Sequence, residues 1–229
     1  MQSVRENLVE IGKKTTAFKP ESYLRVYEKM FEPLRHLELS LLELGIWDGG
    51  SLDAWATYFP YGRIAGVDLK LPELPPHDRI HMFEGDQADP AVLSRAAAAV
   101  APNGFDIIID DCAHIGTVAK ASFWYLFEHH LKPGAIYVIE DWGTGYMSDW
   151  PDGKVYAPEP DGNGRMPSHD AGMVGFIKQL LDEVYPGNSF MVEPRDSKFE
   201  SISIHWGLCI ITKALGSTGH THLINTRSV

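Results

Sequence analysis

Apolar residues in this chain gather in short runs that alternate with stretches of helical periodicity. Five runs bounded by turn residues predict strands: Leu41–Leu44, Arg63–Val67, Ile80–Phe83, Phe105–Ile109 and Ile136–Ile139. Helical spacing predicts helices over Leu52–Phe59, Pro90–Val100, Thr117–His130 and Met173–Val184. Strands that alternate with helices are typical of a doubly wound, mostly parallel sheet. The pattern therefore predicts an α/β fold of the Rossmann-like class.

The two ends of the chain complete the predicted domain organisation. Apolar positions in Glu21–Leu37 predict a leading helix or pair of helices, within a segment 1–39 that packs on the domain or covers it. The sheet domain then spans 40–215. Its late apolar runs, Ser189–Val192 and Ser201–Thr212, predict an antiparallel hairpin at the sheet edge, and residues 216–229 form a polar tail.

Composition narrows the classes of partner. The 229 residues are 44% apolar, which suits one globular domain with a substantial core. A formal net charge of −11 argues against binding to nucleic acid or to an anionic membrane. Cys112 and Cys209 lie in apolar stretches and predict buried thiols in a reducing compartment. No run is long enough to span a membrane and the first residues lack a signal-peptide pattern, so we expect a cytoplasmic protein.

The strand ends carry the first candidate site. In the stretch Glu43–Ser51, Gly45, Gly49 and Gly50 let the backbone approach a ligand, and Ser51 can start a helix whose N–H groups face it. Asp68 ends the next strand, where a carboxylate can accept both hydroxyls of a ribose. Asp86 offers an acceptor for an adenine amine, with the amide of Gln87 beside it, although Asp86 also fits a solvated loop.

These features fit a nucleoside cofactor, and the geometry alone suits NAD as well as S-adenosylmethionine. The absence of basic residues for phosphates near the glycine turn favours the donor without phosphates. The interpretation without a ligand is a tight turn between a strand and a helix.

A second group of residues predicts a metal site. Asp110, Asp111 and His114 follow one strand, and Glu140 and Asp141 follow its neighbour. Carboxylates crowded in a cleft repel each other unless a cation neutralises them, and Mg²⁺ prefers oxygen ligands. A metal lowers the pKa of a bound hydroxyl, and an imidazole nearby can remove its proton. The alternative is that the Asp pair caps a helix and that His114 is structural.

The segment from Trp142 to His169 is too long for a simple connector. It is rich in Gly, Pro, Asp and aromatic residues, which predicts recognition of a ligand or mobility. Trp142, Tyr146 and His169 are weak candidates for the substrate side. Aromatic residues in loops also commonly anchor the loop to the domain.

Several of these motifs resemble a known family. The stretches LLELGIWDGGSLDAWATYFPYGRIAGVDLK, EGDQADP and FDIIIDDCAHIGTVAKASFWYLFEHHLKPGAIYVIEDW, with the following GTGY, resemble metal-dependent sugar O-methyltransferases of macrolide and related antibiotic pathways. The likeness covers about residues 40 to 146. It implies a seven-stranded sheet with an antiparallel C-terminal edge strand, and a transferase that uses S-adenosylmethionine and Mg²⁺.

The resemblance also implies roles for individual residues. The metal ligands would be Asp111, Glu140 and Asp141, and the base would be His114. The donor pocket would be lined by Glu43, Gly45, Gly49, Ser51, Asp68, Asp86, Gln87 and Asp110. The acceptor would be a small molecule, a sugar of a glycosylated natural product, and a homo-oligomer is possible.

Two departures leave alternatives open. Cys112-Ala113 replaces the usual Gly-Ser, and the large N-terminal domain of some macrolide enzymes is not matched. A catechol-like acceptor would use the same metal chemistry. The pattern is also shared with proteins similar to cephalosporin hydroxylase, so an oxygenase remains an alternative, as does a binding module that keeps only the donor fold.

Overall fold

The structure is a computed structural model that describes residues 6–15, 17, 19–156, 158–159, 162–166, 168–185 and 195–216. Contacts divide the chain into two compact units, Met1–Cys112 and Ala113–Val229. The boundary lies between Cys112 and Ala113. Each unit is described by itself, and the division of the chain at residues 39 and 215 stays a prediction.

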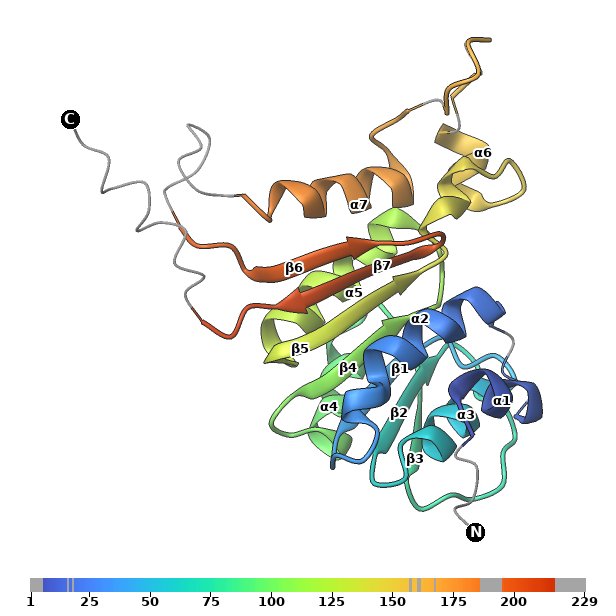
Figure 1. Cartoon of the computed structure of the whole chain (residues 1–229), viewed down its shortest axis with the longest axis vertical. Coiled ribbons are helices and arrows are strands. Elements are labelled where there is room, and N and C mark those ends of the chain that lie inside the picture. Colours follow the sequence, from blue (N-terminus) through green and yellow to red (C-terminus); the bar gives the residue numbers. More distant parts are fainter. Residues whose placement is uncertain are drawn as a thin grey trace, which may run out of the picture. The chain divides into compact units, whose positions relative to one another are not determined.

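The first unit is built on four parallel strands (Figure 1). Their order is β3-β2-β1-β4, and β1 pairs in parallel with both β2 and β4. Their bounds are β1 Ser40–Leu44, β2 Arg63–Asp68, β3 Ile80–Glu84 and β4 Phe105–Asp110. The centres of β1, β2 and β4 are buried because helices cover both faces of this sheet, whereas β3 at its edge is only partly buried.

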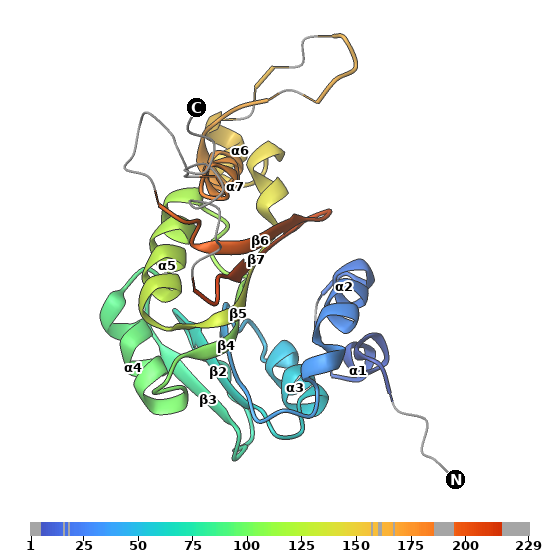
Figure 2. The same cartoon turned by 60° about the vertical axis from the view of Figure 1, so that its left-hand side comes forward.

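Helices lie on both sides of these strands (Figure 2). Helix α4 (Pro90–Val100) covers one face, and α3 (Gly50–Tyr58), α1 (Leu8–Lys14) and α2 (Glu21–Phe31) lie on the other side. The helix predicted within Glu21–Leu37 is present as α2, followed by a 3₁₀ turn, η1 (Glu32–Leu34), and α1 precedes it outside the predicted range. Tyr27 and Phe31 of α2 contact the ring of Trp55 in α3, with centroids 5.5 and 6.1 Å apart. These aromatic contacts fix α2 to α3 within the first unit.

The second unit contains three strands in the order β5-β7-β6. Strand β7 pairs antiparallel with both neighbours. The bounds are α5 Gly116–His129, β5 Leu131–Glu140, η2 Trp142–Tyr146, α6 Pro151–Tyr156, α7 Gly172–Asp182, β6 Phe199–Ile204 and β7 Leu208–Lys213. The described residues thus hold four strands in one unit and three in the other, seven in all, with an antiparallel edge formed by β7 and β6.

The edge hairpin corrects one prediction. The run Ser201–Thr212 is not a single strand, because it folds back at Gly207, whose φ is +74°. Strands β6 and β7 therefore form the hairpin between themselves, and Ser189–Val192 lies outside the described residues, as do residues 217–229 of the predicted tail. Strand β5 also begins at Leu131, earlier than the predicted Ile136. The Pro133-Gly134 pair correctly indicated that the preceding helix, α5, had ended. Because this pair lies inside β5, the strand was predicted to begin too late.

A buried carboxylate joins two helix starts in the second unit. Asp152 is 6% exposed, and its Oδ2 accepts the N–H groups of Gly116 and Met173, each at 2.7 Å. These groups open α5 and α7, where backbone donors lack partners within the helix. Gly116 and Gly172 pack so closely that a Cβ on Gly116 would lie 2.1 Å from the Gly172 carbonyl carbon. Asp152 therefore ties α6 to the first turns of both helices.

The described residues include no helix long and apolar enough to cross a membrane.

We expect Asp152→Ala to lower the free energy of unfolding by about 2–4 kcal/mol, because it leaves two buried N–H groups without their acceptor. Urea denaturation followed by circular dichroism measures this change. Asp149→Ala, which removes an exposed carboxylate three residues earlier, is the matched control and should shift the value by less than about 0.5 kcal/mol. Equal stability of the two variants would contradict the role of Asp152.

Candidate functional site

The turn that follows β1 brings its backbone close to the end of β4. Gly45 has a φ of +90°, and a Cβ there would lie 2.1 Å from the carbonyl oxygen of Asp111. Gly49 has a φ of +86° and precedes the first residue of α3. Only glycine fits these two positions without strain. The turn therefore exposes the N-terminus of a nine-residue helix at the carboxyl end of the strands.

Asp68 fixes the shape of this turn. Its Oδ2 accepts the backbone N–H groups of Ile46 at 2.7 Å and Trp47 at 3.2 Å. Trp47 adopts a left-handed backbone with φ +51°, and its side chain is exposed. A non-glycine residue is rarely held in this region unless its surroundings impose it. Asp68 lies at the predicted strand end, and ribose binding by its carboxylate stays a prediction.

Glu43 is fully buried at the end of β1 and is bound from two sides. The hydroxyl of Ser51 donates to its Oε2 at 2.6 Å, and Lys19 Nζ lies 3.1 Å from its Oε1. The ammonium is at ion-pair distance, but Oε1 accepts no well-directed hydrogen bond in the described part of the chain. Burial raises the pKa of the Glu43 carboxyl, and the ammonium of Lys19 and the Ser51 hydroxyl oppose this rise. A ligand that carries a donor group would suit this oxygen.

Lys19 also reaches the predicted metal ligand Asp111. Its Nζ donates to Asp111 Oδ2 at 2.7 Å, and the lysine side chain is only 2% exposed. Sequence reasoning missed Lys19 because no motif surrounds it, and 92 residues separate it from Asp111.

Two further predicted residues form a buried pair. Gln87 Nε2 donates to Asp110 Oδ1 at 3.0 Å, and both residues are 3% exposed. Gln87 and Asp110, both predicted to bind the cofactor, are thus brought together at the carboxyl ends of β3 and β4. Asp86 is exposed, and its Oδ1 accepts the N–H of Ala88 at 2.8 Å.

The end of β4 lies in a strongly negative field. Cys112 is partly buried rather than fully buried as predicted, and its pKa is raised to about 12. Burial is the main cause, followed by the carboxylates of Asp110, Asp68, Asp111 and Asp86. A field that opposes a thiolate favours a cation at the same place. Cys209 is buried, as predicted.

In the second unit, the candidate base lies beside a carboxylate. His114 Nε2 is 4.0 Å from Asp141 Oδ2, and the histidine side chain is 11% exposed. The backbones of both residues are left-handed, with φ of +50° and +53°. The ring of Trp150 meets His114 edge-on, with centroids 5.1 Å apart. Two strained residues and a ring contact hold the imidazole toward Asp141.

The remaining predicted residues fall at the end of β5 and in segment 142–169. Glu140 is buried, and the carbonyl of Asp141 accepts the N–H and hydroxyl of Thr144 in η2. Trp142 Nε1 donates to the carbonyl of His205 at 3.3 Å, which fits an anchoring role. Tyr146 and His169 form an edge-on ring pair with centroids 5.0 Å apart. His169 Nε2 is buried without a hydrogen-bond partner in the described residues.

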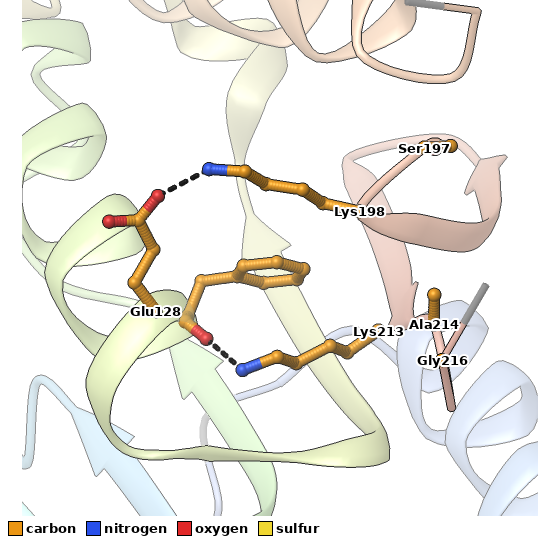
Figure 3. Close-up of a pocket in the computed structure, with 7 residues that line it drawn as sticks. Glu128, Ser197, Lys198, Lys213, Ala214 and Gly216 are labelled. Carbon is orange, nitrogen blue, oxygen red and sulfur yellow. Dashed lines mark hydrogen bonds and ion pairs between the residues drawn. The ribbon is translucent and has the colours of Figure 1, made fainter. Parts of the chain in front are cut away.

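A pocket of about 290 Å³ lies elsewhere in the second unit (Figure 3). Lys198 reaches Glu128 there, and Lys213 donates to the carbonyl oxygens of Phe127 and Leu131. Leu131 is the first residue of β5, and the predicted metal ligand Glu140 is the last. Because a ten-residue strand is about 30 Å long, Leu131 and Glu140 lie far apart. None of the predicted site residues lines this pocket.

Comparisons with known proteins support the methyltransferase resemblance. No family model matches the chain. It is 34% identical over 211 residues to the 8-demethyl-8-alpha-L-rhamnosyl tetracenomycin-C 2'-O-methyltransferase of Streptomyces olivaceus, covering 87% of this chain and 52% of that protein. It is 36% identical over 165 residues to the demethylmacrocin O-methyltransferase of Streptomyces fradiae, covering 69% and 38%. The chain thus spans about half, or less, of the length of these relatives.

A solved structure extends the likeness to the fold. MycE methyltransferase of the mycinamycin pathway, in complex with Mg, S-adenosylhomocysteine (SAH) and mycinamycin VI, matches with a TM-score of 0.74 and 27% identity. The match covers 93% of this chain and 54% of that one. The seven-stranded, Rossmann-like methyltransferase fold and the resemblance to sugar O-methyltransferases are therefore confirmed.

We expect both thiols of the metal-free protein to react slowly at pH 8. A thiol with a pKa of about 12 is ionised in only about one molecule in ten thousand at that pH, and the thiolate is the nucleophile. Titration with a chromogenic disulfide in EDTA should run at least about a hundredfold slower in the folded protein than in urea. One equivalent of fast-reacting thiol in the folded protein would contradict the negative field at Cys112.

Proposed function

We propose that this chain is an S-adenosylmethionine- and Mg²⁺-dependent O-methyltransferase that acts on a sugar hydroxyl of a glycosylated natural product. The relatives named above are sugar O-methyltransferases, and the solved neighbour binds Mg and SAH. Among the contacts of this chain, the glycine turn held by Asp68 beside the buried carboxylate of Glu43 carries the proposal.

The first unit supplies residues suited to the donor. The left-handed backbone at Gly45 and Gly49 shapes the turn before α3, and Glu43 Oε1 can accept a hydrogen bond from the donor's amino group. Asp68 has a second carboxylate oxygen for a ribose hydroxyl. Asp86 and the Gln87–Asp110 pair would border the adenine. The negative field at Cys112 also favours a sulfonium cation.

The predicted ligand set also fits a hard cation. Asp111, Glu140 and Asp141 offer carboxylate oxygens, which are the ligands that Mg²⁺ prefers. In the metal-free chain the ammonium of Lys19 pairs with Asp111, which shows that this carboxylate already binds a positively charged group. We propose these three carboxylates as the metal ligands. Bound Mg²⁺ would lower the pKa of an acceptor hydroxyl, and the donor would supply an electrophilic methyl group.

His114 is proposed as the base. Its imidazole would accept the hydroxyl proton, and the resulting imidazolium would lie 4.0 Å from the carboxylate of Asp141. The acceptor oxygen would then bond to the methyl carbon as the carbon–sulfur bond breaks, and the electron pair would remain on sulfur. Trp150 and the left-handed backbone at His114 orient the ring for this step. Segment 142–169 is proposed to contribute the acceptor contacts.

We expect His114→Ala to lower turnover about 10²- to 10⁴-fold and to leave SAH affinity within about twofold, because general-base catalysis acts on the transition state. Methyl transfer to demethylmacrocin, mycinamycin VI and rhamnosyl tetracenomycin measures turnover, and calorimetry measures affinity. His129→Ala, an exposed histidine on α5, is the matched control. Turnover near the wild-type value in His114→Ala would refute the base assignment. Methylation of catechols by the wild-type chain, with none of the sugars, would refute the acceptor class.

A further inference from the structure

We propose that Lys19 is a built-in counter-cation that holds Asp111 in the metal-free protein and competes with the divalent metal for this carboxylate. Lys19 would thereby set the metal affinity of the site. This inference rests on the proposed function, because it takes Asp111 to be a metal ligand.

Lys19 forms a buried ion pair with two carboxylates. Its Nζ lies 2.7 Å from Asp111 Oδ2 and 3.1 Å from Glu43 Oε1, and its side chain is 2% exposed. Burying an ammonium is costly unless charged partners and hydrogen bonds compensate it. Two carboxylates from different strand ends supply this compensation.

The negative charge of this strand edge explains both the presence of Lys19 and its competition with a divalent metal. Glu43 and Asp110 are buried and Asp111 is partly buried, so this strand edge needs positive charge whenever no ligand supplies it. Lys19 supplies one unit of charge. A divalent cation bound to Asp111 would meet the repulsion of this ammonium at short range, and it would have to displace the ammonium or share the carboxylate with it.

The neighbouring helix lets Lys19 leave without unfolding the first unit. Lys19 precedes Pro20, which caps α2, and α2 is fixed independently by Tyr27 and Phe31 against Trp55. The ammonium sits at the end of a flexible four-carbon chain. Its release from Asp111 therefore requires a side-chain movement rather than movement of the helix.

Calorimetric titration of Mg²⁺ into the whole chain tests this competition directly. Lys19→Met keeps the length of the side chain and removes its charge, so we expect it to bind Mg²⁺ at least about tenfold more tightly than the wild type. Lys13→Met removes a charge from the same region, but at an exposed lysine that pairs with Glu21, and it should match the wild type. Unchanged or weaker binding by Lys19→Met would overturn the proposal, because weaker binding would mean that Lys19 positions Asp111 for the metal.

A second measurement uses the wild-type chain, so that it does not depend on the folding of a variant. Amine labelling followed by mass spectrometry should modify Lys19 slowly in EDTA and several-fold faster with Mg²⁺, while exposed Lys13 reacts equally in both. Equal or slower labelling of Lys19 with Mg²⁺ would overturn the proposal.

The two experiments also separate this inference from the proposed function. If Mg²⁺ binds the wild type and Lys19→Met equally, only the competition is refuted. If Mg²⁺ binds neither protein, the metal-dependent function is refuted and the competition with it.

Discussion

Carboxylates that are removed from water at the carboxyl ends of parallel strands must each find a positive or hydrogen-bonding partner. In residues 1–112 this requirement determines the contacts around the candidate site. Lys19 and Ser51 bind Glu43, Gln87 binds Asp110, and the backbone N–H groups of residues 46, 47 and 70 bind Asp68. The glycine turn, the leading helices and the end of β4 are joined through these contacts. The same concentration of negative charge makes the edge suitable for a cationic donor and a metal ion.

The second unit meets a different constraint, which is the geometry of the backbone at His114, the proposed base. His114 and Asp141 both adopt left-handed conformations, which cost non-glycine residues about 1–3 kcal/mol each. Helix starts tied together by Asp152, and the ring of Trp150 against His114, supply compensating contacts. Strain of this kind gathers at functional positions because a required side-chain orientation is maintained at the expense of stability.

The sequence predicted the elements that have clear periodicity. Buried parallel strands read as apolar runs, and four of the five predicted strands match β1 to β4 within a residue or two. The polar residues that follow these strands are where the pattern placed them, because strand ends share one edge whatever the side chains do. The hairpin was predicted wrongly, since only three residues, His205 to Gly207, separate two strands that look like one apolar run.

Contacts between distant residues could not be predicted in this way. Lys19 and Asp152 carry no motif, and each acts through partners at least 20 residues away along the chain. Their importance depends on burial and on the close approach of elements, which local propensity does not encode. The contacts of Trp142, Tyr146 and His169 could not be predicted for the same reason, because segment 142–169 follows no regular period.

The most direct test of the central claim is calorimetric titration of SAH into the purified chain, with Mg²⁺ and then with EDTA, with NAD⁺ as the control ligand. The account predicts saturable binding of SAH at one site per chain and no binding of NAD⁺. Absence of SAH binding in both conditions, or binding of NAD⁺ in its place, would contradict the assignment of this fold to methyl transfer.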